Sequence, residues 1–146
     1  IRASASMPLV SRIVEIEGRK LLDGGIADSI PVRYFQSIGY DRNVVVLTQP
    51  KDYQKGKNSA MPLIRMKYKR YPNLVAAMEN RPAVYNETLA YIAQEEAAGR
   101  LLVLRPPEPL PVDRVEKDPE HLKAAYTIGH QTAKKRLPEI KAYLQG

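Results

Sequence analysis

Asp23, Gly24 and Gly25 are the residues of this chain whose types and spacing are best suited to chemistry. They follow a stretch expected to be a strand, and active-site groups of α/β folds gather just outside strand ends. A carboxylate there can act as a general base toward a group within hydrogen-bond reach. The glycines permit a turn with positive φ and a close approach by other backbone. A plain Asp-Gly loop turn is the non-catalytic alternative.

The other groups that could act as nucleophiles or metal ligands form weaker patterns. Ser4 and Ser6 lie in an alanine-serine segment with no adjacent base, so we expect a structural role for both. His121 and His130 stand nine positions apart on an expected helix and so point to different faces. A metal pair on a helix needs a spacing of about three or four. The chain has no cysteine, and we predict neither a metal site nor a cofactor.

Strand and helix patterns alternate along the chain, which predicts an α/β fold. The 146 residues suffice for one domain with a core. Two short strands are expected on either side of Glu17 and Gly18, which suit a tight turn. The further elements are a helix from Pro31 to Ile38, a buried parallel strand over 43–48, a loop over 51–59, a basic helix over 60–70 and a strand over 101–104.

The longest helical patterns lie in the second half, and each contains a proline. Pro82 is expected to interrupt the first, with Asn80 capping a fresh helix that ends at Gly99. Asp118 is expected to cap the last helix, and Pro138 to kink or end it. The apolar face of this last helix consists of Leu122, Ala125, Gly129, Ala133, Leu137 and Ile140.

Two segments near the start resemble the patatin-like phospholipase family. The first is the alanine-serine run of residues 2–8, which ends in proline, and the second is residues 21–32, which contain Asp23-Gly24-Gly25. The chain therefore looks like the C-terminal part of a bacterial patatin-like phospholipase, as a single domain over residues 1–146. Further likeness, which extends the resemblance over nearly the whole chain, lies in residues 44–48, 80–86 and 126–129.

The resemblance implies a three-layer α/β/α fold and hydrolysis of lipid acyl esters by a serine-aspartate dyad. It implies that Asp23 is the general base that takes the proton from the serine hydroxyl, and that Gly24 and Gly25 shape its turn. The chemistry is reasonable because a serine hydroxyl is a weak nucleophile near neutral pH and needs an adjacent base. Such a dyad requires no histidine.

The sequence lacks the nucleophile that the resemblance implies. In that family the serine lies in a Gly-x-Ser-x-Gly elbow, and a glycine-rich loop forms the oxyanion hole; both precede the aspartate. Ser59 follows Gly56 one position too late for such an elbow, and no glycine follows it. We therefore expect a cut N-terminal end, a longer parent protein that carries the serine, and a polypeptide that is inactive alone.

The formal net charge of +7 predicts an anionic partner. The densest basic cluster comprises Arg65, Lys67, Lys69 and Arg70 around Tyr68. We favour a solvated helix face for this cluster. If the cluster does act, contact with an anionic membrane suits a lipid hydrolase best, and we expect no nucleic-acid binding. The rival to the hydrolase is a basic α/β module without catalysis that binds nucleic acid or anionic membrane. Its binding would weaken steeply with salt.

The expected location is cytoplasmic, with peripheral membrane contact. No apolar run approaches the roughly 20 residues that span a bilayer, and no secretory signal is visible at the start. The few expected strands leave apolar helix surface uncovered. We therefore expect the isolated chain to self-associate.

Overall fold

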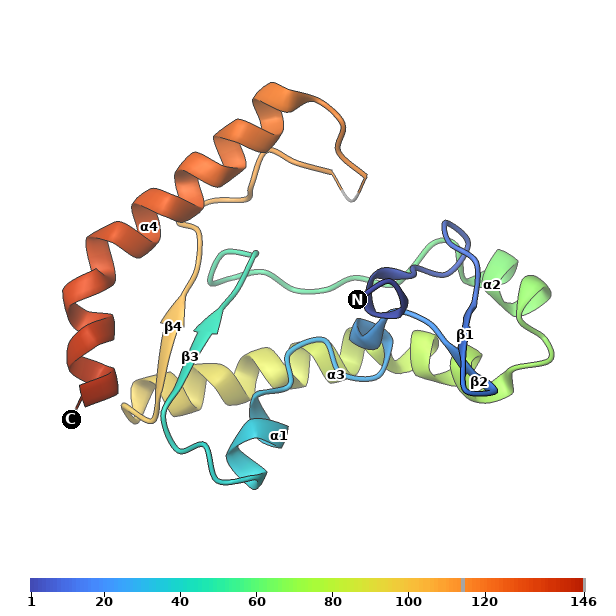
Figure 1. Cartoon of the computed structure of the whole chain (residues 1–146), viewed down its shortest axis with the longest axis horizontal. Helices are drawn as coiled ribbons and strands as arrows, with labels where there is room; N and C mark the ends of the chain where they lie inside the picture. Colours follow the sequence, from blue (N-terminus) through green and yellow to red (C-terminus); the bar gives the residue numbers. More distant parts are fainter. Residues whose placement is uncertain (114, 146) are drawn as a thin grey trace. The chain divides into compact units, whose positions relative to one another are not determined.

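The computed structural model describes residues 1–113 and 115–145, which form two compact units. Unit 1 consists of Ile1–Pro31 and Gln54–Ala90, and unit 2 of Val32–Tyr53 and Tyr91–Gly146. Helices and two small sheets make up a mixed α/β structure, which confirms the predicted class (Figure 1). The three-layer arrangement and the single domain stay predictions.

Unit 1 begins with a short 3-10 helix, η1 (Ala3–Ala5), followed by a hairpin. Strands β1 (Val14–Ile16) and β2 (Arg19–Leu21) pair antiparallel. The turn between them contains Glu17 and Gly18 with φ of 51° and 74°, as the sequence predicts. The hairpin leads directly into a second 3-10 helix, η2 (Gly24–Ile26), which carries the Asp-Gly-Gly motif.

The core of unit 1 holds the hairpin against two helices. Ile64 of α2 (Met61–Lys67), the following Tyr68 and Met78 of α3 (Pro72–Ala97) form a buried cluster. The Tyr68 hydroxyl accepts a hydrogen bond of 3.1 Å from the backbone N–H of Leu9, so this buried phenol is satisfied by the N-terminal segment. The segments packed against this cluster include Leu22 and Ile26, which flank the Asp-Gly-Gly motif: the full set is Leu9, Ile13, Leu22, Ile26, Ala60, Met61, Tyr71, Leu74 and Val75.

Unit 2 is built on a parallel strand pair. Strands β3 (Asn43–Val46) and β4 (Leu101–Leu104) pair in parallel, with Val45 opposite Val103. All of β4 is buried, and the continuous apolar runs of both strands are typical of parallel sheets. The strand predicted over 43–48 is therefore confirmed over 43–46, but within β3 the predicted burial holds for Val45 alone, and Val46 is 70% exposed. Helix α1 (Val32–Ser37) contacts β3.

A buried charge connects α1 with the end of α3. Glu95 is buried and accepts hydrogen bonds from Arg100, at 2.9 Å, and from Gln36 of α1, at 3.3 Å. The hydrogen bond from Arg100 lowers the pKa of Glu95 below its ordinary value. Charge pairing of this kind is what permits a carboxylate to be buried.

Helix α3 is continuous, and the predicted interruption at Pro82 is wrong. A proline inside a helix removes one backbone hydrogen bond and crowds the preceding turn. Here α3 is buried at Met78 on one side of Pro82 and at Ile92 on the other, so packing on both sides holds the helix together. Asn80 consequently lies inside the helix and caps nothing. Gly99, with φ of 72°, follows the helix end as predicted.

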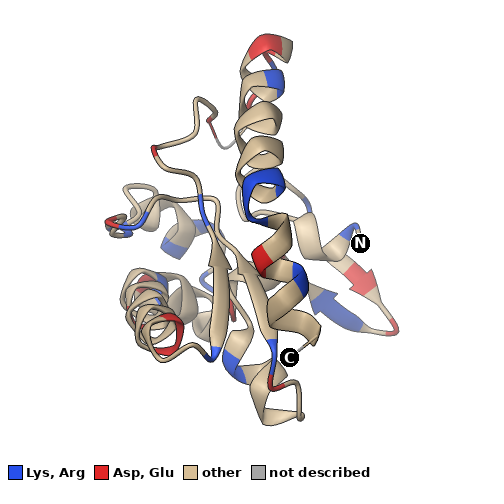
Figure 2. Cartoon of the chain, turned by 90° about the vertical axis from the view of Figure 1, so that its left-hand side faces the viewer, with Lys and Arg blue, Asp and Glu red and all other residues tan. Residues whose placement is uncertain are grey.

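Helix α4 (Pro119–Gln145) begins where the sequence predicts. Asp118 Oδ1 accepts a hydrogen bond of 2.9 Å from the N–H of Glu120, which is an N-cap contact. Pro138 lies inside the helix and does not end it. Acidic and basic residues are spread along α4 (Figure 2), and none of its described residues is buried. Leu122 and Leu137 of the predicted apolar face are 49% and 46% exposed.

None of the helices in the described residues 1–113 and 115–145 combines the length and apolar content needed to cross a membrane.

The parallel strand pair provides a matched test of burial in unit 2. Val103 is fully buried, whereas Val46 of the paired strand is 70% exposed. We expect Val103→Ala to lower the free energy of unfolding by about 2 kcal/mol, because it removes two buried methyl groups and leaves a cavity. Both variants also lose strand propensity. Apart from this shared loss, Val46→Ala should lower the free energy of unfolding by less than about 0.5 kcal/mol. Denaturant unfolding measures both values, and equal costs would contradict this packing.

The N-terminus of α4 is expected to be sensitive to pH. Glu116 Oε1 accepts the N–H of Asp118 at 2.9 Å, and Glu116 Oε2 lies 3.0 Å from His121 Nδ1. These contacts lower the pKa of Glu116 to about 2 and raise the pKa of His121 above its ordinary 6.5. Glu116 thus stabilises the folded chain above its ordinary pKa and loses this effect as pH falls toward 2. His121 stabilises it below pH 6.5 and loses this effect as pH rises through the raised value.

An NMR titration of His121 in wild type and in Glu116→Gln tests this pair. The His121 midpoint should lie above 6.5 in wild type and move down toward 6.5 in the variant. The same midpoint in both proteins would show that Glu116 does not hold His121 in solution.

Candidate functional site

Asp23 begins the 3-10 helix η2 and acts as its N-cap. Its Oδ1 accepts a hydrogen bond of 2.7 Å from the N–H of Gly25, and its own N–H donates to the carbonyl of Ser6 at 2.9 Å. The side chain is half-buried, and no serine hydroxyl of the described residues donates to it. The carboxylate is therefore fixed through one oxygen, and its Oδ2 has no hydrogen-bond partner within residues 1–113 and 115–145.

The two glycines of the motif differ from the sequence-based expectation. Neither Gly24 nor Gly25 has a positive φ. A Cβ on Gly24 would meet no atom within 4 Å, whereas a Cβ on Gly25 would lie 3.0 Å from Asp23 Oδ1 and 3.4 Å from Arg81 Nη2. Gly25 is thus needed for space rather than for its φ, and the groups that approach it are side chains rather than backbone.

The carbonyl oxygen of Gly25 accepts two hydrogen bonds. Arg81 of α3 donates through Nε at 2.7 Å, and the hydroxyl of Ser29 donates at 2.6 Å. The Ser29 oxygen also lies 3.4 Å from Arg81 Nε. Sequence reasoning missed both residues. Ser29 stands four positions after Gly25, a spacing that suits a local side-chain-to-backbone bond, but Arg81 is 56 positions away and no local pattern indicates it.

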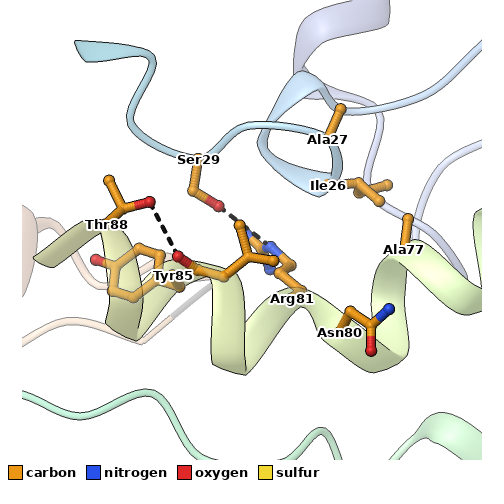
Figure 3. A pocket seen from close by; sticks show the side chains of 9 residues that line it. Ile26, Ala27, Ser29, Ala77, Asn80, Arg81, Tyr85 and Thr88 are labelled. Carbon is orange, nitrogen blue, oxygen red and sulfur yellow. Dashed lines mark hydrogen bonds between the residues drawn. The ribbon is translucent and has the colours of Figure 1, made fainter. Parts of the chain in front are cut away.

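A cavity of about 220 Å³ lies beside this turn (Figure 3). Ser29 comes to it from the segment after η2, and Arg81 from α3. Apolar side chains from both segments contribute to its wall as well. The lining residues are Ile26, Ala27, Ser29, Ala77, Asn80, Arg81, Val84, Tyr85 and Thr88. Its wall combines apolar side chains with a few polar groups.

Ser4 and Ser6 have the local roles that the sequence predicts. The Ser4 hydroxyl donates to the carbonyl of Ile1 and the Ser6 hydroxyl to that of Arg2, both at 2.8 Å. His121 pairs with Glu116, and His130 stacks on Tyr126, so neither meets the other. Within residues 1–113 and 115–145, no three His, Asp or Glu side chains come together as a group that could hold a metal ion.

The predicted basic cluster lies on α2 and the residues that follow it. Arg65 forms an ion pair of 2.6 Å with Glu79, and Lys67 lies over the ring of Tyr68. Lys69 and Arg70 are exposed at the end of this segment. The cluster is therefore accessible, but one of its four charges is already neutralised by a carboxylate of its own unit.

Two family models match different parts of the chain. A model described as patatin-like phospholipase matches residues 1–35, which include the whole Asp-Gly-Gly turn. This match is shorter than the resemblance predicts. A model described as a domain of unknown function, DUF6363, matches residues 71–145, about half of the chain, and includes Arg81. A comparison with curated proteins gives no match.

The boundaries of the two matches do not coincide with those of the compact units. Unit 1 contains most of the patatin-like match together with the first part of the DUF6363 match, so the Asp-Gly-Gly turn and Arg81 belong to the same unit. The chain belongs to the DUF6363 family and begins with a segment similar to patatin-like phospholipases.

Proposed function

We propose that this chain is part of a patatin-like hydrolase of lipid acyl esters, in which Asp23 is the general base. The observation that carries the proposal is the position of Asp23 inside the patatin-like match, in a turn that holds one of its carboxylate oxygens. The other oxygen has no hydrogen-bond partner among the described residues 1–113 and 115–145. The resemblance to the patatin-like family supplies the reaction class.

The proposed reaction uses a serine that lies outside this sequence, which contains no Gly-x-Ser-x-Gly elbow. The serine oxygen attacks the carbonyl carbon of the ester, and its proton passes to Asp23 Oδ2. Asp23 then gives the proton to the departing alcohol, which leaves an acyl-serine. Water then attacks the acyl-serine while Asp23 takes its proton. Asp23 returns this proton to the serine oxygen as the acyl–oxygen bond breaks, which releases the fatty acid and restores both groups.

Holding Asp23 Oδ1 on the Gly25 N–H suits this role. The hydrogen bond fixes the direction of the carboxylate before a substrate arrives, which lowers the entropic cost of aligning the base. The three-layer α/β/α fold belongs to the same proposal, with its remaining strands supplied by the parent protein.

We also propose that α2 and the residues after it contact an anionic membrane. Leu63 and Met66 of α2 are 48% and 67% exposed, and no acidic residue occurs between Asp52 and Glu79. Exposed apolar side chains among basic ones are typical of segments that lie at a membrane surface. Lys67, Lys69 and Arg70 carry the charge, because Arg65 is paired with Glu79.

Asp23→Asn tests the role of the carboxylate without disturbing the turn. Asparagine keeps an Oδ1 that can accept the Gly25 N–H but cannot take a proton. In the complete gene product, we expect kcat/KM for a short-chain p-nitrophenyl ester to fall by about 10²–10⁴-fold. Asp28→Asn is the matched control, since Asp28 Oδ1 accepts the N–H of Ile30 in the same manner, and it should keep wild-type activity. A rate in Asp23→Asn within a few-fold of wild type would contradict the proposal.

Vesicle sedimentation tests the membrane contact. Changing Lys67, Lys69 and Arg70 to Gln should weaken binding to vesicles that contain phosphatidylserine on the order of 100-fold, at about 1 kcal/mol per charge. The same change at Lys134, Lys135 and Lys141 of α4 removes equal charge and should have a smaller effect.

Three outcomes argue against this membrane contact. Equal losses in the two triple variants would indicate that net charge alone drives binding. Binding to vesicles of phosphatidylcholine alone would remove the need for anionic lipid. Tighter, salt-dependent binding to duplex DNA would favour the non-catalytic basic module instead.

A further inference from the structure

The Asp-Gly-Gly turn is held from one side by a single long side chain. Arg81 leaves α3 near its middle and donates through Nε to the carbonyl of Gly25 at 2.7 Å. The same Nε lies 3.4 Å from the Ser29 hydroxyl oxygen (Figure 3). Arg81 forms no ion pair within the described residues 1–113 and 115–145, so its hydrogen bonds to this turn are its specific polar contacts. A charged donor to a carbonyl makes a stronger hydrogen bond than a neutral one.

Arg81 acts on Asp23 indirectly, through the backbone of Gly25. The carbonyl of Gly25 is held by Arg81 and Ser29, and the N–H of the same residue holds Asp23 Oδ1. Fixing the carbonyl limits rotation of η2, and therefore fixes the direction in which the Gly25 N–H points. The missing side chain of Gly25 is what lets the guanidinium and the carboxylate both approach, since a Cβ would lie 3.0 Å from the carboxylate oxygen.

The helix that carries Arg81 and the Asp-Gly-Gly turn pack against the same buried cluster. Arg81 stands three positions after the buried Met78 and directly before Pro82, within a continuous helix. Met78 belongs to the same buried cluster that Leu22 and Ile26 pack against. The helix and the turn are therefore anchored on both sides of the Arg81 contact.

We propose that Arg81 is a positioning residue for Asp23, and that the first part of the DUF6363 domain serves to hold the catalytic turn of the patatin-like segment. The catalytic part of this inference rests on the function proposed above. Arg81 does not touch the reacting atoms; it acts through Gly25.

Hydrogen exchange of this chain tests the contact independently of catalysis. The amides to follow are those of Gly25, Ile26 and Ala27, which donate to Asp23 Oδ1, the Asp23 carbonyl and the Gly24 carbonyl. Arg81→Met keeps an unbranched side chain that reaches about as far as Nε, but removes the guanidinium and all its donors. Exchange at these amides should accelerate about tenfold or more, while the amide of Tyr68 in the core keeps its wild-type rate. Arg12→Met, an exposed arginine in the same unit, is the control.

Kinetics of the complete gene product supply the second readout. We expect Arg81→Met to lower kcat about tenfold with KM nearly unchanged, because the turn is misaligned while substrate binding is kept. Arg81→Lys retains the charge and a terminal donor, and should recover part of both the exchange protection and kcat. Arg12→Met should behave as wild type in both assays.

The outcomes separate this inference from the proposed function. Faster exchange in Arg81→Met combined with a lower kcat supports both. Faster exchange in a protein whose wild type hydrolyses no ester supports the contact of Arg81 with the turn and contradicts the hydrolase. Unchanged exchange at Gly25 to Ala27, or faster exchange with an unchanged kcat, overturns the positioning role.

Discussion

The peptide groups on either side of Gly25 are the constraint on which the candidate site depends. One presents its N–H to the Asp23 carboxylate, and the other presents its carbonyl to Arg81 and Ser29. A side chain at this position would meet the carboxylate oxygen at 3.0 Å. Because Gly25 has no side chain, the Asp23 carboxylate and the Arg81 guanidinium can both bind this short segment. They do so without forming an ion pair with each other. The second oxygen of Asp23 has no hydrogen-bond partner in the part of the chain that the structure describes, which suits the proposed role of general base.

The buried cluster of unit 1 gives this turn its support. Met78 of α3 packs with Ile64 and Tyr68, and the residues flanking the motif, Leu22 and Ile26, pack against them. The patatin-like segment supplies the aspartate and the DUF6363 segment supplies the helix behind it. Two sequence families thus contribute to one hydrophobic core. In the proposal made above, the DUF6363 segment has a structural role in unit 1, because its helix α3 supports the Asp-Gly-Gly turn.

Features with local chemical causes could be predicted from the sequence. The hairpin turn at Glu17 and Gly18, the existence of the apolar strands β3 and β4, and the Asp118 cap of α4 all follow from residues adjacent in the chain. The continuous helix through Pro82 could not, because packing on both sides overrides the local cost of proline. The sequence locates Asp23 but not Arg81, since a contact across 56 positions leaves no local pattern.

Labelling of the complete gene product with a fluorophosphonate tests whether Asp23 is the base, because the reagent phosphonylates a serine only when a neighbouring base activates it. We expect one serine outside this sequence to be labelled in the wild type. We also expect Asp23→Asn to slow this labelling by about 10²-fold or more, with Asp28→Asn unchanged. Equal labelling rates in wild type and Asp23→Asn, or no labelled serine at all, would contradict the assignment of Asp23 as the base.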